Sequence, residues 1–421
     1  MMKTNRRFRG SVIAALDIGS SKIACFIGRS VGGSKMEVLG VGHQASKGIK
    51  AGTITDMAAA EAAVRKAVHA AENMASDVMN GYPLRDVVIN VPGIHARSHV
   101  FSADIQVMGQ EVSQNDVQRA LVKAQSEVLS EDYELIHTIP IGYRIDGHEG
   151  IREPCGMVGD KLEVGIHLVT GDVGPLQNFA TCIERSHLDV EALCVSAYAA
   201  GLACLVEDEM DLGCTVIDVG GGVTSFAVFQ GRSMIYGGGV SIGGEHVTND
   251  IAKGLTCSMA DAERIKTLYG GALATSSDDN EFLEVQRVGE DEQNMHSVPR
   301  SLLIGIIQPR LEEIFEQVRA KIEDHELSYT VGRRVVLTGG ASQIPGLKDL
   351  AQTVLDKQVR LGRPIQVNAL PDAVSGPAFA TTAGLLTYVT ERKQEMPAEI
   401  MAQADHGTLW ERVKLWWREN W

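Results

Sequence analysis

The chain has 421 residues, of which 44% are hydrophobic and 22% charged, and its formal net charge is −15. This composition is typical of a soluble globular protein of about two to four domains and excludes a disordered chain. The acidic balance argues against a general nucleic-acid binder, because phosphate contacts need a basic face. The seven cysteines contain no CxxC pair, which favours reduced cytoplasmic thiols over disulfides or a zinc site.

The first strong pattern in the chain is a strand, a sharp Gly/Ser turn and a second strand at residues 12–28, with Asp17 at the end of the first strand. The same pattern recurs at residues 214–229, where Asp218 stands 201 residues after Asp17 and precedes three glycines. A further β-rich run follows each copy. We interpret this as a repeat of a whole domain half rather than a chance likeness between two hairpins.

Helices and strands alternate between the two copies. Residues 56–79 predict one long Ala-rich helix, and residues 87–91 predict a buried strand. Residues 99–167 run as a strand, a helix and two more strands, which predicts a small α+β insertion. Helices are expected at residues 175–184 and 196–206.

The second copy is followed by an acidic stretch at residues 275–296, which has seven acids against one base and predicts a solvated loop or the edge of a small subdomain. The remaining predicted elements are a helix at 302–326 containing Pro309, a strand at Arg334–Thr338, a helix ending near 357, a small-residue helix at 378–389 and a polar linker after it. No run is apolar and long enough for a membrane-spanning helix.

Asp17 and Asp218 each end a buried strand directly before glycine-rich backbone. A tight turn there points successive N–H groups at one spot and forms an anion-binding nest. Two facing turns would hold a polyphosphate from both sides, and the carboxylates would hold Mg²⁺ through water, because Mg²⁺ keeps most of its hydration shell. Lys22 can reach a phosphate, and Gly339-Gly340-Ala341 lets backbone pack closely against a flat ring or a phosphate.

All four tryptophans lie in the last twelve residues. If residues 408–421 form a helix, its apolar side chains fall within an arc of about 140°. These side chains are Leu409, Trp410, Val413, Trp416, Trp417 and Trp421. Such a helix is expected to lie flat in the headgroup region of a bilayer, and clustering of several chains would strengthen its weak binding. The alternative is a helix that docks on the protein itself or on a partner.

These segments together resemble the FtsA family, actin-like proteins that tether the FtsZ ring to the bacterial inner membrane. The resemblance covers nearly the whole chain and rests on residues 16–22, 217–222, 338–340, 156–164, 300–310 and the C-terminal helix. The DxG and GG motifs are common to actin-like proteins, whereas the insertion and the C-terminal helix narrow the likeness to FtsA.

The resemblance implies an actin-like α/β fold, a duplicated ribonuclease-H-like fold with a small α+β insertion subdomain and a C-terminal amphipathic helix. Four subdomains would surround an ATP cleft. The expected division is subdomain 1A at 1–85, 167–198 and 372–390, insertion subdomain 1C at 86–166, subdomain 2A at 199–245 and 301–371, subdomain 2B at 246–300, a linker at 391–406 and a membrane-targeting helix at 407–421.

The resemblance also implies the roles of site residues. Asp17 and Asp218 would line the Mg²⁺ site of a bound ATP. The two phosphate hairpins would comprise Gly19, Ser20, Ser21 and Lys22, and Gly220, Gly221, Gly222 and Thr224. The nucleoside contacts would be Glu263 and Lys266 at the ribose and Gly339, Gly340 and Ala341 at the adenosine. No catalytic residue is assigned.

The implied function is an ATP-binding division protein that polymerises on the cytoplasmic face of the inner membrane at the division site and binds no nucleic acid. It would bind the FtsZ C-terminal tail at residues 246–300, with Arg300 as a contact, and recruit later divisome proteins through residues 86–166. Residues 192–196 lack the carboxylate with which DnaK-type chaperones orient water, so at most slow ATPase activity is expected.

Two alternatives to this function remain open at this point. One is a small-molecule kinase of the same fold, which would need an acceptor pocket and a base and would have no use for a Trp-rich tail. The other is the FtsA-like group of pilus-assembly ATPases, which shares the insertion but would not be expected to end in this helix.

Overall fold

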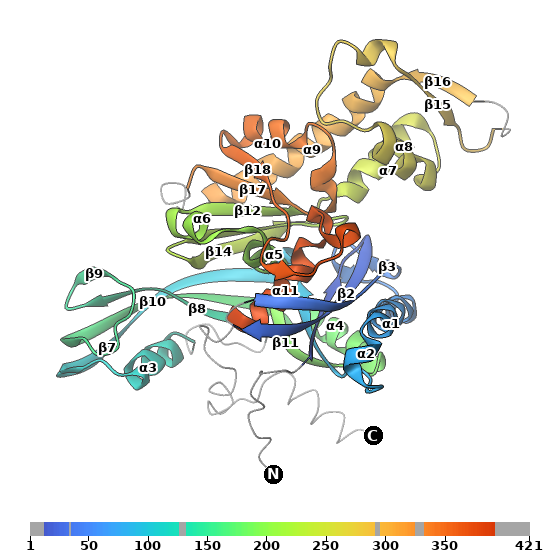
Figure 1. Cartoon of the computed structure of the whole chain (residues 1–421). Coiled ribbons are helices and arrows are strands. Elements are labelled where there is room, and N and C mark those ends of the chain that lie inside the picture. The colour runs from blue at the N-terminus through green and yellow to red at the C-terminus, as the bar shows by residue number, and fades with distance from the viewer. Residues whose placement is uncertain (1–11, 33–34, 126–131, 291–294, 325–331, 392–421) are drawn as a thin grey trace.

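The computed structural model describes residues 12–32, 35–125, 132–290, 295–324 and 332–391. Two β-sheets with helices packed on them form the body of the molecule (Figure 1), a third sheet projects from one side, and a small lobe lies at the far end of the second half. The predicted linker beyond residue 391 and the predicted helix at 407–421 lie outside the described residues.

The first sheet has six strands, in which β1 pairs antiparallel with β2 and parallel with β6. Its order is β11 (Asp189–Val195), β6 (Asp86–Val91), β1 (Val12–Ile18), β2 (Lys22–Gly32), β3 (Lys35–Ala45) and β19 (Val367–Asn368). The short β19 returns to this sheet from the segment 301–371 that we expected in subdomain 2A, because it pairs with the edge strand β3.

The second sheet repeats this arrangement. Its order is β14 (Ser233–Val240), β13 (Thr224–Gln230), β12 (Cys214–Val219), β17 (Arg334–Thr338) and β18 (Gln358–Leu361). Here β12 pairs antiparallel with β13 and parallel with β17, as β1 does with β2 and β6. The predicted duplication of a domain half is therefore confirmed.

Two central helices join the halves, with α11 (Ala380–Glu391) packed against β1 and β2 and α5 (Ser196–Cys204) against β12 and β13. A Cβ on Gly384 of α11 would lie 1.7 Å from the carbonyl oxygen of Ala199, so the two helices touch backbone to backbone. Their buried side chains share one core with both sheets. Two helix backbones packed this closely leave the two halves little freedom to shift where they meet.

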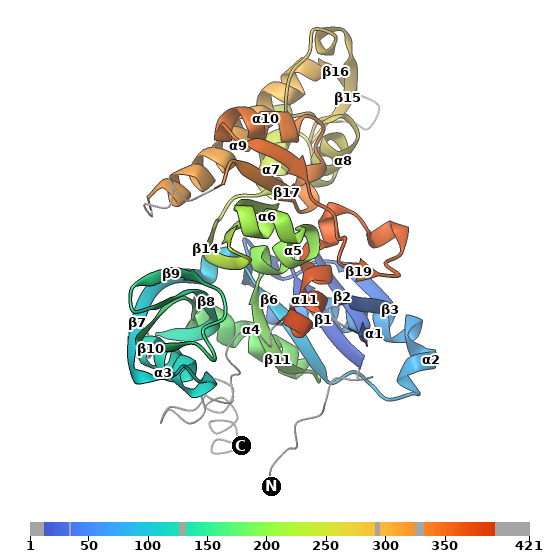
Figure 2. The ribbon, with the colours of Figure 1, turned by 60° about the vertical axis from the view of Figure 1, so that its left-hand side comes forward.

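The outer faces of the sheets are covered by further helices (Figure 2). On the first half these are α1 (Met57–Met74), α2 (Ser76–Met79) and α4 (Val173–Arg185), and on the second α9 (Arg300–Glu323) and α10 (Leu347–Leu355). The short α6 (Glu207–Leu212) lies on the same face of the second sheet as α5, where Met210 packs against the shared core. The single helix predicted at 56–79 is broken at Ala75, which leaves the ideal helical geometry with ψ 8°. The Asp56 carboxylate caps α1 by accepting from Ala59 N at 3.1 Å.

The insertion is a four-stranded sheet with one helix. Its elements are β7 (Ala96–Glu111), α3 (Gln114–Gln125), β8 (Tyr133–Ile145), β9 (His148–Ile151) and β10 (Val158–Asp172), and the sheet order is β7-β10-β8-β9. The boundaries expected at 86–166 need correction, because β6 belongs to the first sheet through its parallel pairing with β1. In the structure the insertion begins at the first strand after β6 and ends with β10.

The small lobe consists of α7 (Gly244–Leu255), α8 (Met259–Tyr269) and the hairpin of β15 (Phe282–Gln286) and β16 (Met295–Pro299). The acidic stretch, expected to be a solvated loop or the edge of a small subdomain, contributes β15 and a buried carboxylate, Asp278, to this lobe. None of the described helices is long and apolar enough to cross a membrane. All seven cysteines are free, and six of them are buried.

Candidate functional site

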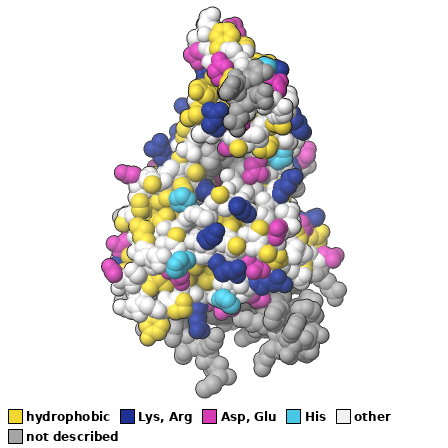
Figure 3. Space-filling model, turned by 90° about the vertical axis from the view of Figure 1, so that its right-hand side faces the viewer, with side chains coloured by type: hydrophobic (Ala, Val, Ile, Leu, Met, Phe, Trp, Pro, Cys, Tyr) yellow, Lys and Arg dark blue, Asp and Glu magenta, His cyan; other side chains and the backbone are white. Residues whose placement is uncertain are grey.

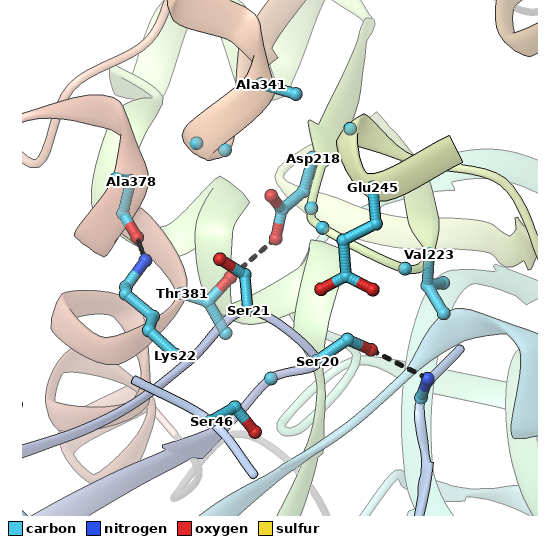
Figure 4. A pocket seen from close by; sticks show the side chains of 18 of the residues that line it. Ser20, Ser21, Lys22, Ser46, Asp218, Val223, Glu245, Ala341, Ala378 and Thr381 are labelled. Carbon is cyan, nitrogen blue, oxygen red and sulfur yellow. Dashed lines mark hydrogen bonds between the residues drawn. The ribbon is translucent and has the colours of Figure 1, made fainter. Parts of the chain in front are cut away.

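A cavity of about 690 Å³ lies between the two halves. Residues from both hairpin turns, from α7 and α8, and from the segment after β17 line it (Figure 4). Both repeat acids, Asp17 and Asp218, open into it. The duplicated turns therefore face one shared crevice, which is the arrangement that a two-sided anion site requires.

The two turns have the same backbone geometry. Gly19 N donates to Lys22 O at 3.0 Å in the first, and Gly220 N donates to Val223 O at 2.9 Å in the second. Such tight turns direct their remaining amide groups toward one point and form a nest for an anion. The local sequence folds this way because glycine stands where each strand ends and the chain reverses.

The tips of the turns touch, and this contact explains the run of glycines. A Cβ on Gly221 would lie 2.7 Å from the Cβ of Ser21, and one on Gly222 would lie 2.5 Å from the Ser20 hydroxyl oxygen. Side chains at these two positions would push the halves apart. The second turn therefore has glycines at the positions where the first turn has serines.

The carboxylates of Asp17 and Asp218 are held by neighbouring threonines of α11. Thr382 donates to Asp17 Oδ2 at 3.1 Å, and Thr381 donates to Asp218 Oδ2 at 2.6 Å. Burial raises the pKa of Asp17, and burial together with the charge of Asp17 raises the pKa of Asp218 to about 6. Two carboxylates in one crevice can accept hydrogen bonds from the water ligands of a divalent cation.

Lys22 lines the cavity but points along its wall. Its ammonium group donates to the carbonyl oxygen of Ala378 and lies 4.5 Å from the centre of the Phe379 ring. An anion in the nest would require this side chain to leave the carbonyl and swing inward. Lysine suits this task because its point charge sits on a flexible stem.

The opposite end of the cavity is formed by α7, α8 and η4 (Gly340–Gln343). Lys266 donates to Glu263 Oε2 at 2.6 Å and to the Thr248 hydroxyl at 2.7 Å, and Thr248 donates to Glu263 at 2.5 Å. This network fixes the Glu263 carboxylate at the cavity wall, where it can accept hydrogen bonds from vicinal hydroxyls. Gly340 and Ala341 form the facing wall.

Gly339 is in a position that only glycine tolerates. Its φ is +90°, and a Cβ there would lie 2.3 Å from Asp218 Oδ1. The predicted glycine pair after β17 thus allows the second carboxylate to sit directly beneath this turn.

Comparison with known proteins identifies the family. The family model described as Cell division protein FtsA matches residues 215–384, and the model described as SHS2 domain inserted in FTSA matches residues 93–170. Cell division protein FtsA of Rhizobium meliloti (strain 1021) is 42% identical over 391 residues, which cover 90% of this chain and 87% of the relative. The chain belongs to the FtsA family. The Escherichia coli (strain K12) protein of this name is 30% identical and covers 97% of the chain and 98% of its own length.

Solved structures show that FtsA-like chains share the actin-like fold with other proteins. The PilM-PilN type IV pilus biogenesis complex matches with a TM-score of 0.63 at 16% identity, covering 89% of this chain and 97% of that chain. MreB5 of Spiroplasma citri bound to ADP matches with a TM-score of 0.50 at 12% identity, covering 94% and 99%. At these identities the likeness shows the fold alone. Membership of a cell-division family sets aside the kinase and pilus-assembly alternatives.

The structure corrects one predicted site residue and adds two. Thr224 is fully buried, donates to Ile242 O at 2.8 Å and does not line the cavity, whereas its neighbour Ser225 does. The pairing of β12 with β13 identifies Ser225 as a site residue, because Ser225 pairs directly with Asp218 and so lies on the same face of the sheet. Glu245, at the start of α7, points into the cavity, and burial raises its pKa.

Arg300 lies in the small lobe, away from the cavity lining. It donates to Tyr269 O at 2.9 Å and ion-pairs with the buried Asp278 and with Glu281. The side chain therefore ties the start of α9 to the preceding segment, and about a quarter of it (23%) is exposed. Arg300 therefore holds this part of the small lobe together, and its positive charge is largely neutralised by Asp278 and Glu281.

Charged side chains are mixed over the face drawn in Figure 3, where lysines and arginines are interspersed with acidic residues. The predicted membrane-contacting residues Leu409, Trp410, Val413, Trp416, Trp417 and Trp421 all lie outside the described part of the chain.

Proposed function

We propose that this chain binds Mg²⁺-ATP between its halves and acts as a membrane-attached cell-division protein that anchors FtsZ. The observation that supports this most directly is the shared crevice of Asp17 and Asp218 between two equivalent anion nests. Membership of the FtsA family supplies the link to division.

The residues present fit a magnesium-bound triphosphate. The turns at Gly19–Lys22 and Gly220–Val223 would hold the phosphates, with Lys22 as the cation. Asp17 and Asp218 would hold Mg²⁺ through its water ligands. Glu263, fixed by Lys266, would accept from the ribose hydroxyls, and Gly340 and Ala341 would lie against the base. The metal would supply charge neutralisation for the phosphates.

We infer that hydrolysis is slow and that ATP mainly holds the cleft closed for assembly. Residues 192–196, at the end of β11, carry no acidic side chain to orient water. A single-turnover measurement should therefore give a half-time of minutes or longer. Complete hydrolysis within seconds would contradict this part of the proposal.

Membrane attachment is proposed to depend on the Trp-rich segment at 408–421, and FtsZ binding on the small lobe around α7–α9. The insertion would take part in filament contacts and in recruiting later division proteins. Each role follows the family resemblance, and the sequence of the tail supports the first through its apolar arc.

The experiment that tests the whole proposal is co-sedimentation with lipid vesicles, with and without Mg²⁺-ATP and a peptide of the FtsZ C-terminal tail. The wild-type chain should sediment with vesicles and retain the peptide. Trp416→Glu and Trp417→Glu together should release it from lipid and leave ATP binding intact. If the double variant still sediments with vesicles, the proposed tether is wrong.

A further inference from the structure

Two serines that line the cavity, Ser20 and Ser225, each bind the backbone of a neighbouring segment. In the first half, Gly52 N, in the turn between β4 (Ile49–Lys50) and β5 (Thr53–Ile54), donates to the Ser20 hydroxyl at 3.0 Å (Figure 4). In the second half, Ser225 accepts from Gly93 N at 3.0 Å, at the start of η1 (Gly93–His95). Both serines line the cavity.

Each of these hydroxyls retains a proton for the cavity. A serine hydroxyl is one donor and two acceptors, and each accepts a backbone amide here. Within the described part of the chain, neither hydroxyl donates a hydrogen bond to a protein acceptor. Ser225 is 4% exposed and pairs in register with Asp218, so its hydroxyl lies beside the centre of the site. Both protons are therefore available to an anion.

The two amide donors are connected to each other and to the insertion. His95 Nε2 lies 3.0 Å from Gly52 O and 3.2 Å from the Thr53 hydroxyl, and in the tautomer with the proton on Nε2 the ring donates to the Gly52 carbonyl. The residue after His95 is Ala96, the first residue of β7. Two residues further, the Ser98 hydroxyl accepts from Gly237 N of β14 at 2.9 Å. The first strand of the insertion is thus attached to both halves.

The backbones in these contacts are packed too closely to accommodate an added Cβ. A Cβ on Gly93 would lie 2.2 Å from Gly238 O, and one on Gly239 would lie 2.7 Å from the carbonyl carbon of Gly93. Ala51, beside Gly52, has a φ of +46°, which is unfavourable for a residue with a Cβ. Backbone packed directly on backbone transmits a displacement instead of absorbing it.

We propose that Ser20 and Ser225 both contact the anion bound in the cleft and transmit its presence, through the Gly52 and Gly93 amides, to the first strand of the insertion. Ser225 is a new binding residue in this scheme, and η1 links binding to the insertion. The inference rests on the proposed binding of Mg²⁺-ATP. An anion that accepts the serine proton polarises the hydroxyl and makes its oxygen a stronger acceptor for the amide.

Amide hydrogen exchange of the full chain, with and without Mg²⁺-ATP, tests this inference. Peptides covering residues 49–55 and 92–100 should both exchange at least about threefold more slowly when nucleotide is bound. Ser225→Ala should lose this protection at 92–100 and keep it at 49–55, whereas Ser20→Ala should lose it at both, because the contact of Gly52 with His95 also supports the segment at 92–100. The matched control is Ser102→Ala, on the exposed face of β7, where the hydroxyl donates to Glu163 and contacts neither Gly52 nor Gly93.

His95 offers a second pair of variants in case a serine variant does not fold. His95→Gln keeps an N–H donor for Gly52 O and should keep the nucleotide-dependent protection at 92–100, whereas His95→Leu should lose it. The proposal is overturned if wild-type protection stops at 49–55, or if Ser225→Ala or His95→Leu retains it at 92–100. Nucleotide affinity should be measured in parallel. If the wild type does not bind nucleotide, the proposed function is wrong. If it binds nucleotide without this protection, only the proposed transmission to the insertion is wrong.

Discussion

The two hairpin turns at the cleft have the same backbone and different side chains. Each closes with one bond from a glycine amide to the carbonyl oxygen three residues later. Lys22 in the first turn corresponds to Val223 in the second, and Ala24, opposite Asp17, corresponds to Ser225, opposite Asp218. The first half supplies a cation, and the second supplies consecutive glycines and a buried hydroxyl.

This difference shows which parts of a duplicated site are free to diverge. The nest depends on backbone amides, so both halves keep the turn. The tips meet at contact distance, so only one of them can carry side chains, and Gly221 and Gly222 are opposite Ser21 and Ser20. Both halves carry an acid, and in the proposed site carboxylates from two sides would hold a hydrated cation between them.

The largest effect is expected when either acid is neutralised. Asp17→Asn and Asp218→Asn should each weaken Mg²⁺-dependent ATP binding about 100-fold, because each removes one of the two carboxylates proposed to hold the hydrated metal. Titration calorimetry with and without Mg²⁺ measures this. In the absence of metal, both variants should bind ATP at least as well as the wild type, since a negative charge is gone. A variant that keeps the full magnesium effect would show that its half does not hold the metal.

Adding a methyl group at a hairpin tip comes next. Gly222→Ala places a Cβ against the Ser20 hydroxyl and within 2.9 Å of the Ala51 backbone, and it should lower the free energy of unfolding by about 1–3 kcal/mol. Gly19→Ala in the first turn, at the position equivalent to Gly220, meets only the Lys22 carbonyl oxygen at 2.9 Å and should cost less. Urea unfolding compares the two, and equal losses would mean that the tips do not press on each other.

The cation of the first half should matter less than the acids. Lys22→Ala should weaken ATP binding about tenfold through the loss of one charge-assisted hydrogen bond, whereas Val223→Ala should change it by less than about twofold. A competition assay with a fluorescent nucleotide resolves both. If the two variants behave alike, the division of roles between the turns is wrong.

The smallest expected effect is a pH dependence of the metal-free protein. The Asp218 carboxyl ionises near pH 4 in an unfolded chain, but burial raises its folded pKa to about 6. The folded state therefore binds more protons between these values, and stability should rise as the pH falls from 7.5 to 5. Relative to Asp218→Asn, the wild type should gain about 1 kcal/mol in urea unfolding with a chelator. The gain should shrink in an Asp17→Asn background, and no change in either background would place Asp218 in an ordinary solvated environment.

Much of the candidate site could be predicted because it is local in the chain. The pattern of strand, acid, glycine turn and strand identified Asp17, Asp218 and both hairpins, since a tight turn after a buried strand is determined by a few adjacent residues. Two predictions that depended on distant packing were less accurate. The insertion boundary missed that β6 pairs with β1, and Thr224 was selected in place of Ser225.

The sequence by itself determined the duplication, the two glycine turns with their acids, the presence of an insertion and the concentration of tryptophan in the tail, because each depends on residues close together or on a repeat. Only the tertiary structure decided that Thr381 and Thr382 hold the acids, that Lys22 rests on Phe379, and that Ser20 binds the turn between β4 and β5 while Ser225 binds the segment leading to β7. Backbone turns follow local residue preferences, whereas the partner of a side chain depends on which distant element the closed fold places beside it.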